Sequence, residues 1–192
     1  MKKLLLVLLL GVIITNCRRT VIIDDLNDAS FELLTQDSVA VTFPDDYKGK
    51  YVVMGFIYTN CPDICPLITQ NLMEIQEGLG HPDDVQFLAV SFDPIRDTPA
   101  VLKKFKDIYG LQDNFDFLTG DTLAINAMMD SVRVRTQVSF STTTEAGDEL
   151  YFLNHSDKIM VLNPDSKVII EYGGSQPSVP TLIIEDLNII RK

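Results

Sequence analysis

The distribution of apolar residues along the chain predicts alternating strands and helices. Residues 51–58 form a near-continuous apolar run, as expected for a strand that is buried on both faces of a sheet. Behind it, apolar residues recur at spacings of three and four from Ile64 to Leu79 and stop at Gly80, which predicts an amphipathic helix. Residues 85–92 form a second apolar run and predict a second buried strand. This order indicates a β-α-β unit.

The segments on either side of this unit continue the alternation. Turn-forming residues at 36–38 divide 31–43 into the two strands of a hairpin, and the polar stretch 141–149 predicts an exposed loop. The pattern further predicts helices at 99–110, 121–128 and from 178 onward, and extended segments at 115–118, 132–138, 156–163 and 167–172. The order is that of an α/β thioredoxin-like fold, a central mixed sheet flanked by helices, here with an N-terminal hairpin.

The first residues of the chain predict export from the cytoplasm. Lys2 and Lys3 precede an apolar segment that is short for a membrane span and is typical of a secretory signal peptide. Ile14, three residues before Cys17, resembles a bacterial lipoprotein box. We therefore expect residues 1–16 to be a lipoprotein signal peptide and Cys17 to be the lipidated first residue after cleavage. The alternative is an uncleaved N-terminal anchor.

Both alternatives place the protein in the bacterial cell envelope, in a periplasmic or other extracytoplasmic compartment, and tethered to a membrane. In this scheme residues 17–30 form the membrane tether and residues 31–192 form the thioredoxin-like domain. A chain of this length is typical of a single domain with a proper core, and we expect a monomer. The formal net charge of −11 argues against nucleic-acid binding and against electrostatic adhesion to anionic lipid, so attachment would depend on the lipid chain.

Cys61 and Cys65 carry the candidate chemistry of the domain. They lie between the first buried strand and the helix that follows it, which in a thioredoxin-like fold is the reactive edge of the sheet. Residues four apart in a first helical turn share a face, with Cβ atoms about 6 Å apart, and a helix N-terminus favours thiolates. If Cys17 carries lipid, the two remaining cysteines form one pair. That pair is either a redox couple or a clamp for a soft metal ion.

Three sequence motifs resemble those of the Sco/SenC family. The segment 58–66, Tyr-Thr-Asn-Cys-Pro-Asp-Ile-Cys-Pro, is similar to the family's cysteine motif, although Asn60 stands where histidine is common. The segment 91–99, Ser-Phe-Asp-Pro-Ile-Arg-Asp-Thr-Pro, is similar to the second motif. The third is Asn154-His155-Ser156 with the aliphatic strand and Asn-Pro-Asp that follow it. The likeness extends over essentially the whole expected domain.

The resemblance implies a copper metallochaperone with a thioredoxin-like fold. It implies that Cys61, Cys65 and His155 bind one copper ion, as copper(I) or copper(II). Its expected destination is the CuA site of cytochrome c oxidase during assembly, with the CuA-bearing subunit as partner and other copper chaperones or thiol oxidoreductases as further partners. Two thiolates and an imidazole leave a coordination position open, which suits transfer of a metal better than a closed structural site does.

Several alternatives remain beside this interpretation. A thiol–disulfide oxidoreductase would use Cys61 as the attacking thiol and Cys65 as its redox partner, and could reduce partner cysteines or sense redox state. A peroxidase of the same fold is weaker, because Thr59 alone does not supply the surroundings that chemistry requires. A purely structural disulfide and a histidine without a metal role are the plainest alternatives.

Other residues of the motifs have less specific expectations. Asp93 and Asp97 follow the second strand and either border the site or, for Asp97, cap the next helix. The second histidine, His81, lies in a turn beside Pro82 and is expected to be exposed to solvent.

Overall fold

The computed structural model describes residues 21–111, 114–144, 147 and 149–191. The signal peptide expected at 1–16 and the lipidation site expected at Cys17 lie outside the described residues. Within them, no helix has the length and apolar character that crossing a bilayer requires. The strands are β1 Asp24–Asp25, β2 Phe31–Thr35, β3 Ala40–Phe43, β4 Tyr51–Ile57, β5 Val85–Ser91, β6 Phe115–Thr119, β7 Thr136–Thr143, β8 Glu149–His155, β9 Ile159–Leu162 and β10 Lys167–Tyr172. The α-helices are α1 Ile64–Gly78, α2 Pro99–Tyr109, α3 Thr122–Ser131 and α4 Val179–Ile190, and a short 3₁₀ helix spans Asp45–Tyr47.

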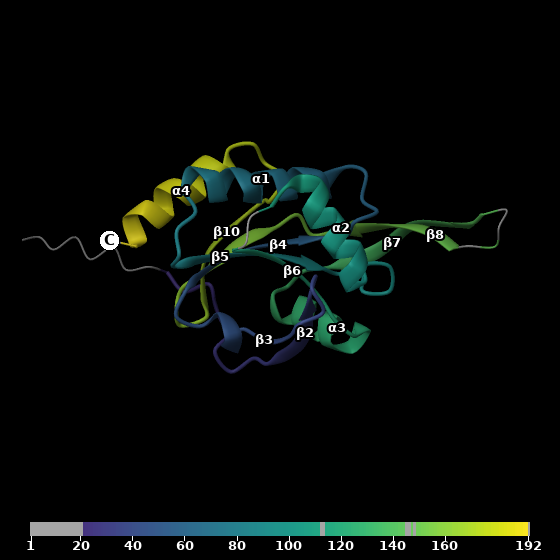
Figure 1. Ribbon diagram of the computed structural model, residues 1–192, viewed down its shortest axis with the longest axis horizontal. Coiled ribbons are helices and arrows are strands. Elements are labelled where there is room, and N and C mark those ends of the chain that lie inside the picture. The colour runs from purple at the N-terminus through teal and green to yellow at the C-terminus, as the bar shows by residue number, and fades with distance from the viewer. Residues whose placement is uncertain (1–20, 112–113, 145–146, 148, 192) are drawn as a thin grey trace, which may run out of the picture.

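The core of the protein is a mixed sheet in the order β1-β10-β9-β4-β5-β6-β2-β3 (Figure 1). The three central strands β4, β5 and β6 are parallel, and the remaining pairings are antiparallel. Every residue of β5 is buried, as is every residue of β4 after Tyr51, because both faces of these strands are covered. The thioredoxin-like arrangement expected from the sequence is therefore confirmed.

Helices cover both sides of the sheet. Figure 1 shows α1 and α4 side by side on one face of the sheet and α3 on the opposite side, near the edge formed by β2 and β3. The apolar stripe expected after the cysteines is the buried face of α1, formed by Ile68, Leu72 and Ile75. Ile183 and Leu187 of α4 are also fully buried, so the final helix packs with the face that its sequence pattern predicts.

The N-terminal boundary of the domain differs from the expected one. β1 pairs with β10 through Asp24 and Val168, and Leu26 is only 3 % exposed. Residues 24–26 therefore belong to the folded domain, and the membrane tether expected at 17–30 does not extend over them. The sequence did not predict this strand, because two acidic residues at the edge of a sheet give no periodic apolar signal.

The segment after α3 also differs from the expectation. β7 and β8 form a separate two-stranded sheet, so the two ends of the loop expected at 141–149 are strand, at residues 141–143 and at 149. All eight residues of β7 are exposed. Apolar alternation predicts an extended segment only as far as residue 138, and the polar residues that follow it, from Ser141 to Thr144, resemble a loop in sequence. Figure 1 shows this hairpin projecting from the end of the molecule.

The close packing of α1 on β4 requires glycine at position 55. A Cβ atom on Gly55 would lie 2.8 Å from Ile68 Cγ2 and 3.0 Å from Leu72 Cδ1. We expect Gly55→Ala to lower the free energy of unfolding by about 1–3 kcal/mol through overpacking, as measured by urea denaturation. Gly173→Ala is the control, since its nearest contact would be an ordinary 3.4 Å to Gln176. Equal stability of the two variants would contradict this account of the packing.

Candidate metal centre

The two cysteines lie where β4 ends and α1 begins. Cys61 is in the connecting loop and is half-buried, whereas Cys65 is in the first turn of α1 and has 0 % exposure. Both are free thiols. The N-cap residue Asp63 makes no side-chain capping bond. Instead, the amide of Cys65 donates to Cys61 Sγ at 3.5 Å, so the sulfur receives a hydrogen bond from the helix N-terminus.

His155 reaches these thiols from a distant part of the sequence. It is the last residue of β8, and its Nε2 lies 3.4 Å from Cys65 Sγ. Its Nδ1 lies 3.0 Å from the Ser156 carbonyl oxygen, an acceptor only, so Nδ1 carries a proton and donates it there. This bond fixes the ring and directs Nε2 to the sulfurs, as in many metal-binding histidines. The rings of Tyr58 and Phe92 flank the imidazole, with centroids 6.1 and 4.7 Å away.

The ligand atoms of Cys61, Cys65 and His155 all lie within 4.8 Å of one another. The structure thus brings together the three residues that the family resemblance selected. Two donors at about 2.3 Å from a shared ion are at most about 4.6 Å apart. Small side-chain rotations would therefore bring all three to one ion, and the donor set of two sulfurs and one nitrogen suits a soft or borderline metal.

The pKa values of the two thiols are shifted in opposite directions. The hydrogen bond from the Cys65 thiol, with further bonds from His155 and from backbone amides, lowers the pKa of Cys61 to about 3. The same bond to Cys61, together with burial, raises the pKa of Cys65. Burial lowers the pKa of His155, but hydrogen bonds to Cys61 and Ser156 outweigh it and the net pKa is raised. Without metal, the pair therefore shares one proton, and Cys61 carries the negative charge near neutral pH.

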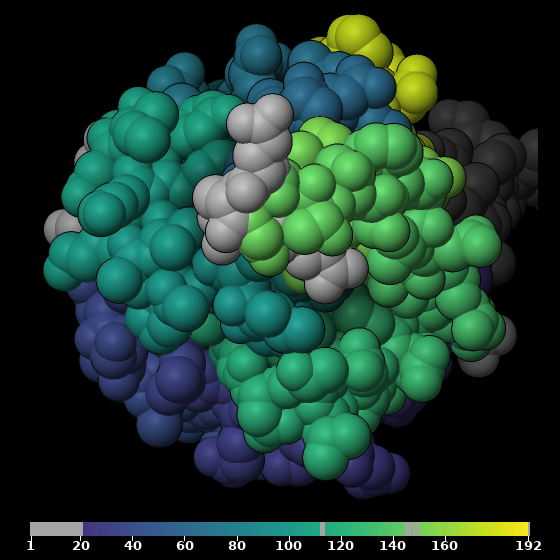
Figure 2. Space-filling model, turned by 90° about the vertical axis from the view of Figure 1, so that its right-hand side faces the viewer, coloured from purple at the N-terminus to yellow at the C-terminus, as the bar shows by residue number. Residues whose placement is uncertain are grey.

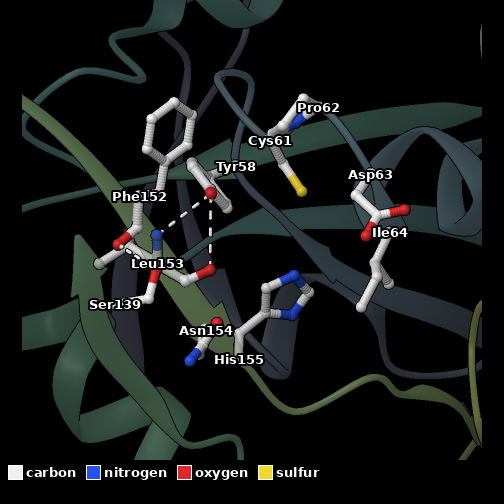
Figure 3. Close-up of a pocket in the computed structure, with 10 residues that line it drawn as sticks. All are labelled: Tyr58, Cys61, Pro62, Asp63, Ile64, Ser139, Phe152, Leu153, Asn154 and His155. Carbon is white, nitrogen blue, oxygen red and sulfur yellow. Dashed lines mark hydrogen bonds between the residues drawn. The ribbon is translucent and has the colours of Figure 1, made fainter.

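A cavity of about 370 Å³ gives access to the site from one side. Its lining comes from the end of β4, the cysteine loop and the β7–β8 hairpin: Tyr58, Cys61, Pro62, Asp63, Ile64, Ser139, Phe152, Leu153, Asn154 and His155. Figure 3 shows the Cys61 sulfur and the His155 ring directed toward each other across this cavity. Figure 2 views the same end of the molecule, with the hairpin in green in front of the body and α2 in teal to its left.

Tyr58 and Asp97 hold the cysteine loop in place. The hydroxyl of Tyr58 accepts from the amide of Leu153 at 3.1 Å and donates to its carbonyl at 3.4 Å, which ties β4 to β8. The carboxylate of Asp97, with 0 % exposure, accepts from the amide of Thr59 at 2.9 Å and from the hydroxyls of Thr59 and Ser91 at 2.5 and 2.6 Å. Burial raises the pKa of this Asp97 carboxyl despite its donors.

The structure also places Asp93, Asp97 and His81, the other residues considered in the sequence. Thr98, not Asp97, is the N-cap residue of α2, so the capping role considered for Asp97 is wrong and its role in holding the loop replaces it. Asp93 is 3 % exposed and does not line the cavity; it accepts a hydrogen bond from the hydroxyl of Tyr151 in β8. His81 is exposed, as expected. The motif gave no physical signal for Tyr58 and Tyr151, because their partners lie 95 and 58 residues away.

Comparison with known proteins identifies relatives of this chain in both sequence and structure. A protein-family model described as SCO1/SenC matches residues 23–188. Among solved structures, Bradyrhizobium japonicum ScoI with copper bound is 29% identical with a TM-score of 0.70, over 83% of this chain and 96% of that one. A SCO1/SenC family lipoprotein from Bacillus anthracis is 26% identical with a TM-score of 0.72, over 91% and 99% of the two chains. BsSco, described as a Sco-family cytochrome c oxidase assembly protein with a disulfide switch, is 31% identical with a TM-score of 0.65, over 83% and 90%.

The acidity of the thiol pair predicts selective alkylation. At pH 5, well above a pKa of about 3, Cys61 is a thiolate, while Cys65 stays protonated because its pKa is raised. We expect iodoacetamide to modify Cys61 and not Cys65 in the reduced, metal-free protein, as mapped by peptide mass spectrometry. In Cys65→Ala the strongest donor to Cys61 is missing, so its labelling should require a higher pH. Labelling of Cys61 in the parent protein that begins only near pH 8 would contradict this charge assignment.

Proposed function

Because this chain belongs to the SCO1/SenC family, we propose that it binds one copper ion through Cys61, Cys65 and His155. The single observation that carries the proposal is the convergence of these three ligand atoms within 4.8 Å. The thiolates suit copper(I), and the imidazole makes a mixed sulfur–nitrogen set that also suits copper(II). The copper-bound relative from Bradyrhizobium japonicum, similar over 83% of this chain, supports the choice of metal.

Copper is the cargo of this protein, and its proposed destination is the CuA site of cytochrome c oxidase during assembly. The cytochrome c oxidase assembly role given for BsSco and the motif resemblance support this destination. Three protein ligands leave a coordination position for a donor from the recipient. The cavity beside Cys61 provides the approach, and the oxidase subunit that bears CuA is the proposed recipient.

The proposed place of action is outside the cytoplasm, at a bacterial membrane. The signal peptide at residues 1–16 and lipidation at Cys17 remain predictions from the sequence. The similar lipoprotein from Bacillus anthracis supports them. A lipid anchor at Cys17 would hold the domain that carries the copper site close to a membrane-bound recipient.

A second function, thiol–disulfide exchange, is favoured by the asymmetry of the thiol pair. Cys61 is partly exposed with a lowered pKa, whereas Cys65 is buried with a raised one. In such exchange the Cys61 thiolate attacks a partner disulfide and releases one partner thiolate. Cys65 then loses its proton and attacks the Cys61 sulfur of the mixed disulfide, which forms a Cys61–Cys65 disulfide and releases the second partner thiolate. The disulfide switch described for BsSco agrees with this chemistry. A peroxidase is not supported, because the Thr59 hydroxyl donates to Asp97.

Copper titration tests the proposed function. We expect the reduced domain to bind one equivalent of copper(I) under anaerobic conditions, and Cys61→Ser combined with Cys65→Ser to abolish binding. His155→Ala should weaken copper(II) binding and remove its thiolate charge-transfer absorption, because the nitrogen ligand is lost. His81→Ala is the matched control, since the chain has 2 histidines and this one is exposed. Undiminished copper binding by the double cysteine variant would refute the proposal.

Disulfide turnover tests the second function separately. His155→Ala should retain both thiols, so if this protein is a reductase the reduced, copper-free variant should still reduce one equivalent of a disulfide substrate and end with a Cys61–Cys65 disulfide. Replacing Cys65 by serine should stop the reaction at the mixed disulfide, because the resolving thiol is missing. Trapping of that adduct by mass spectrometry would support exchange chemistry, whereas absence of any adduct at Cys61 would exclude it.

A further inference from the structure

A cluster of three polar side chains connects the turn after β5 to β8. Arg96 Nε donates to Asp93 Oδ2 at 2.5 Å, and Arg96 Nη1 donates to the carbonyl oxygen of Tyr151 at 2.8 Å. The hydroxyl of Tyr151 donates to Asp93 Oδ1 at 2.6 Å. The guanidinium carbon lies 3.5 Å from the centroid of the Tyr151 ring, so Arg96 also makes a cation–π contact. The Arg96 and Asp93 side chains are 17% and 3% exposed.

This cluster matters because no strand of the central sheet pairs with β8 in the described residues, so side-chain contacts such as those of Leu153 and His155 with the body must hold it. The β7–β8 hairpin is a sheet of its own. An isolated two-stranded hairpin is at best marginally stable in water. Side chains of the body therefore replace a neighbouring strand: Arg96 binds the carbonyl of Tyr151, and the Tyr58 hydroxyl binds both polar backbone groups of Leu153.

The position of the cluster relates it to His155. Residues 151, 153 and 155 are alternate residues of one strand and share one side of it. Arg96 fixes the first of these positions and Tyr58 the second. The third carries the imidazole whose Nε2 lies 3.4 Å from Cys65 Sγ. Freeing β8 at Tyr151 would remove one of the polar attachments beside the thiols and leave the Tyr58 hydrogen bonds, the packing of Leu153 and the contact of the His155 ring with Phe92.

We propose that Arg96, together with Asp93 and Tyr151, is a positioning group that holds β8, and with it His155, at the thiol pair before a metal ion arrives. The proposal rests on the copper function above. It explains why the three ligand atoms already lie within 4.8 Å of one another without a metal ion. None of the three side chains needs to touch the metal. Their effect is to remove the conformational cost of bringing the nitrogen ligand to the sulfurs.

Hydrogen exchange in the metal-free protein is the direct test. In Arg96→Lys the charge beside Asp93 remains, but the planar fork that joins Asp93 to the Tyr151 carbonyl is lost. We expect amides of residues 150–155 to exchange about tenfold faster, a change of about 1.4 kcal/mol in local opening, with α1 amides unchanged. Tyr151→Phe, which removes only the hydroxyl, should show a smaller effect of the same kind and decides the test if Arg96→Lys does not fold.

Two matched controls separate positioning from general stability. Arg191→Lys weakens another arginine–aspartate pair, with Asp84, and Tyr172→Phe removes another tyrosine hydroxyl that donates to an aspartate, Asp186. Neither pair touches β8, so neither variant should change exchange in residues 150–155. Unchanged β8 exchange in the Arg96 and Tyr151 variants, or equal acceleration in α1, would overturn the proposal.

Copper binding provides the second measurement. Copper(II) affinity should fall about tenfold in Arg96→Lys with a weaker thiolate charge-transfer band, while copper(I) affinity, supplied mainly by the sulfurs, should fall less. Equal losses for the two oxidation states would overturn the positioning role. If the parent protein binds no copper, the proposed function fails, and the exchange result in the metal-free protein still decides whether Arg96 holds β8.

Discussion

The hydroxyl of Tyr58 joins the two parts of the chain that carry the three ligand atoms. The cysteines belong to the central sheet and α1, whereas His155 belongs to a hairpin that forms a separate sheet. Tyr58 ends the buried run of β4, its amide donates to Cys65 Sγ at 3.4 Å, and its hydroxyl bonds both backbone groups of Leu153. One residue thus contacts a ligand sulfur and the strand of the ligand nitrogen, and the geometry of the site depends on it.

The electrostatics of the site follow from this geometry. A buried thiol and a partly exposed one lie in hydrogen-bond contact at a helix N-terminus, so the first proton leaves easily and the second is retained. The raised pKa of His155 shows that the thiolate also favours a protonated imidazole. A copper ion can replace these protons on the same three atoms, because metal ligands must be deprotonated to bind. The same three side chains therefore share protons in the metal-free protein and would bind copper in the proposed metal-bound form.

The sequence predicted those features that arise from local pattern. Continuous apolar runs predicted β4 and β5, the spacing of Ile68 and Leu72 predicted the buried face of α1, and the cysteine motif predicted the reactive edge. The role of His155 came from family resemblance, because a single histidine ninety residues away has no local signal. Only the start of β7 was predicted, within the extended segment at 132–138, because the polar residues after it resemble a loop; β1 was missed because two residues give no periodic signal. Contacts of Arg96 with Tyr151 depend on the tertiary fold, and no spacing in the chain predicts them.

The burial of the ligands also sets the order in which they can exchange in the proposed copper carrier. Cys61 and His155 line the cavity, whereas Cys65 has 0 % exposure and does not line it. A donor from the proposed recipient would therefore approach from the side of Cys61 and His155. The sulfur of Cys65 lies on the buried side, where it accepts a hydrogen bond from the amide of Tyr58. In the proposed transfer Cys65 would thus be the ligand least accessible to the recipient and the last to be replaced.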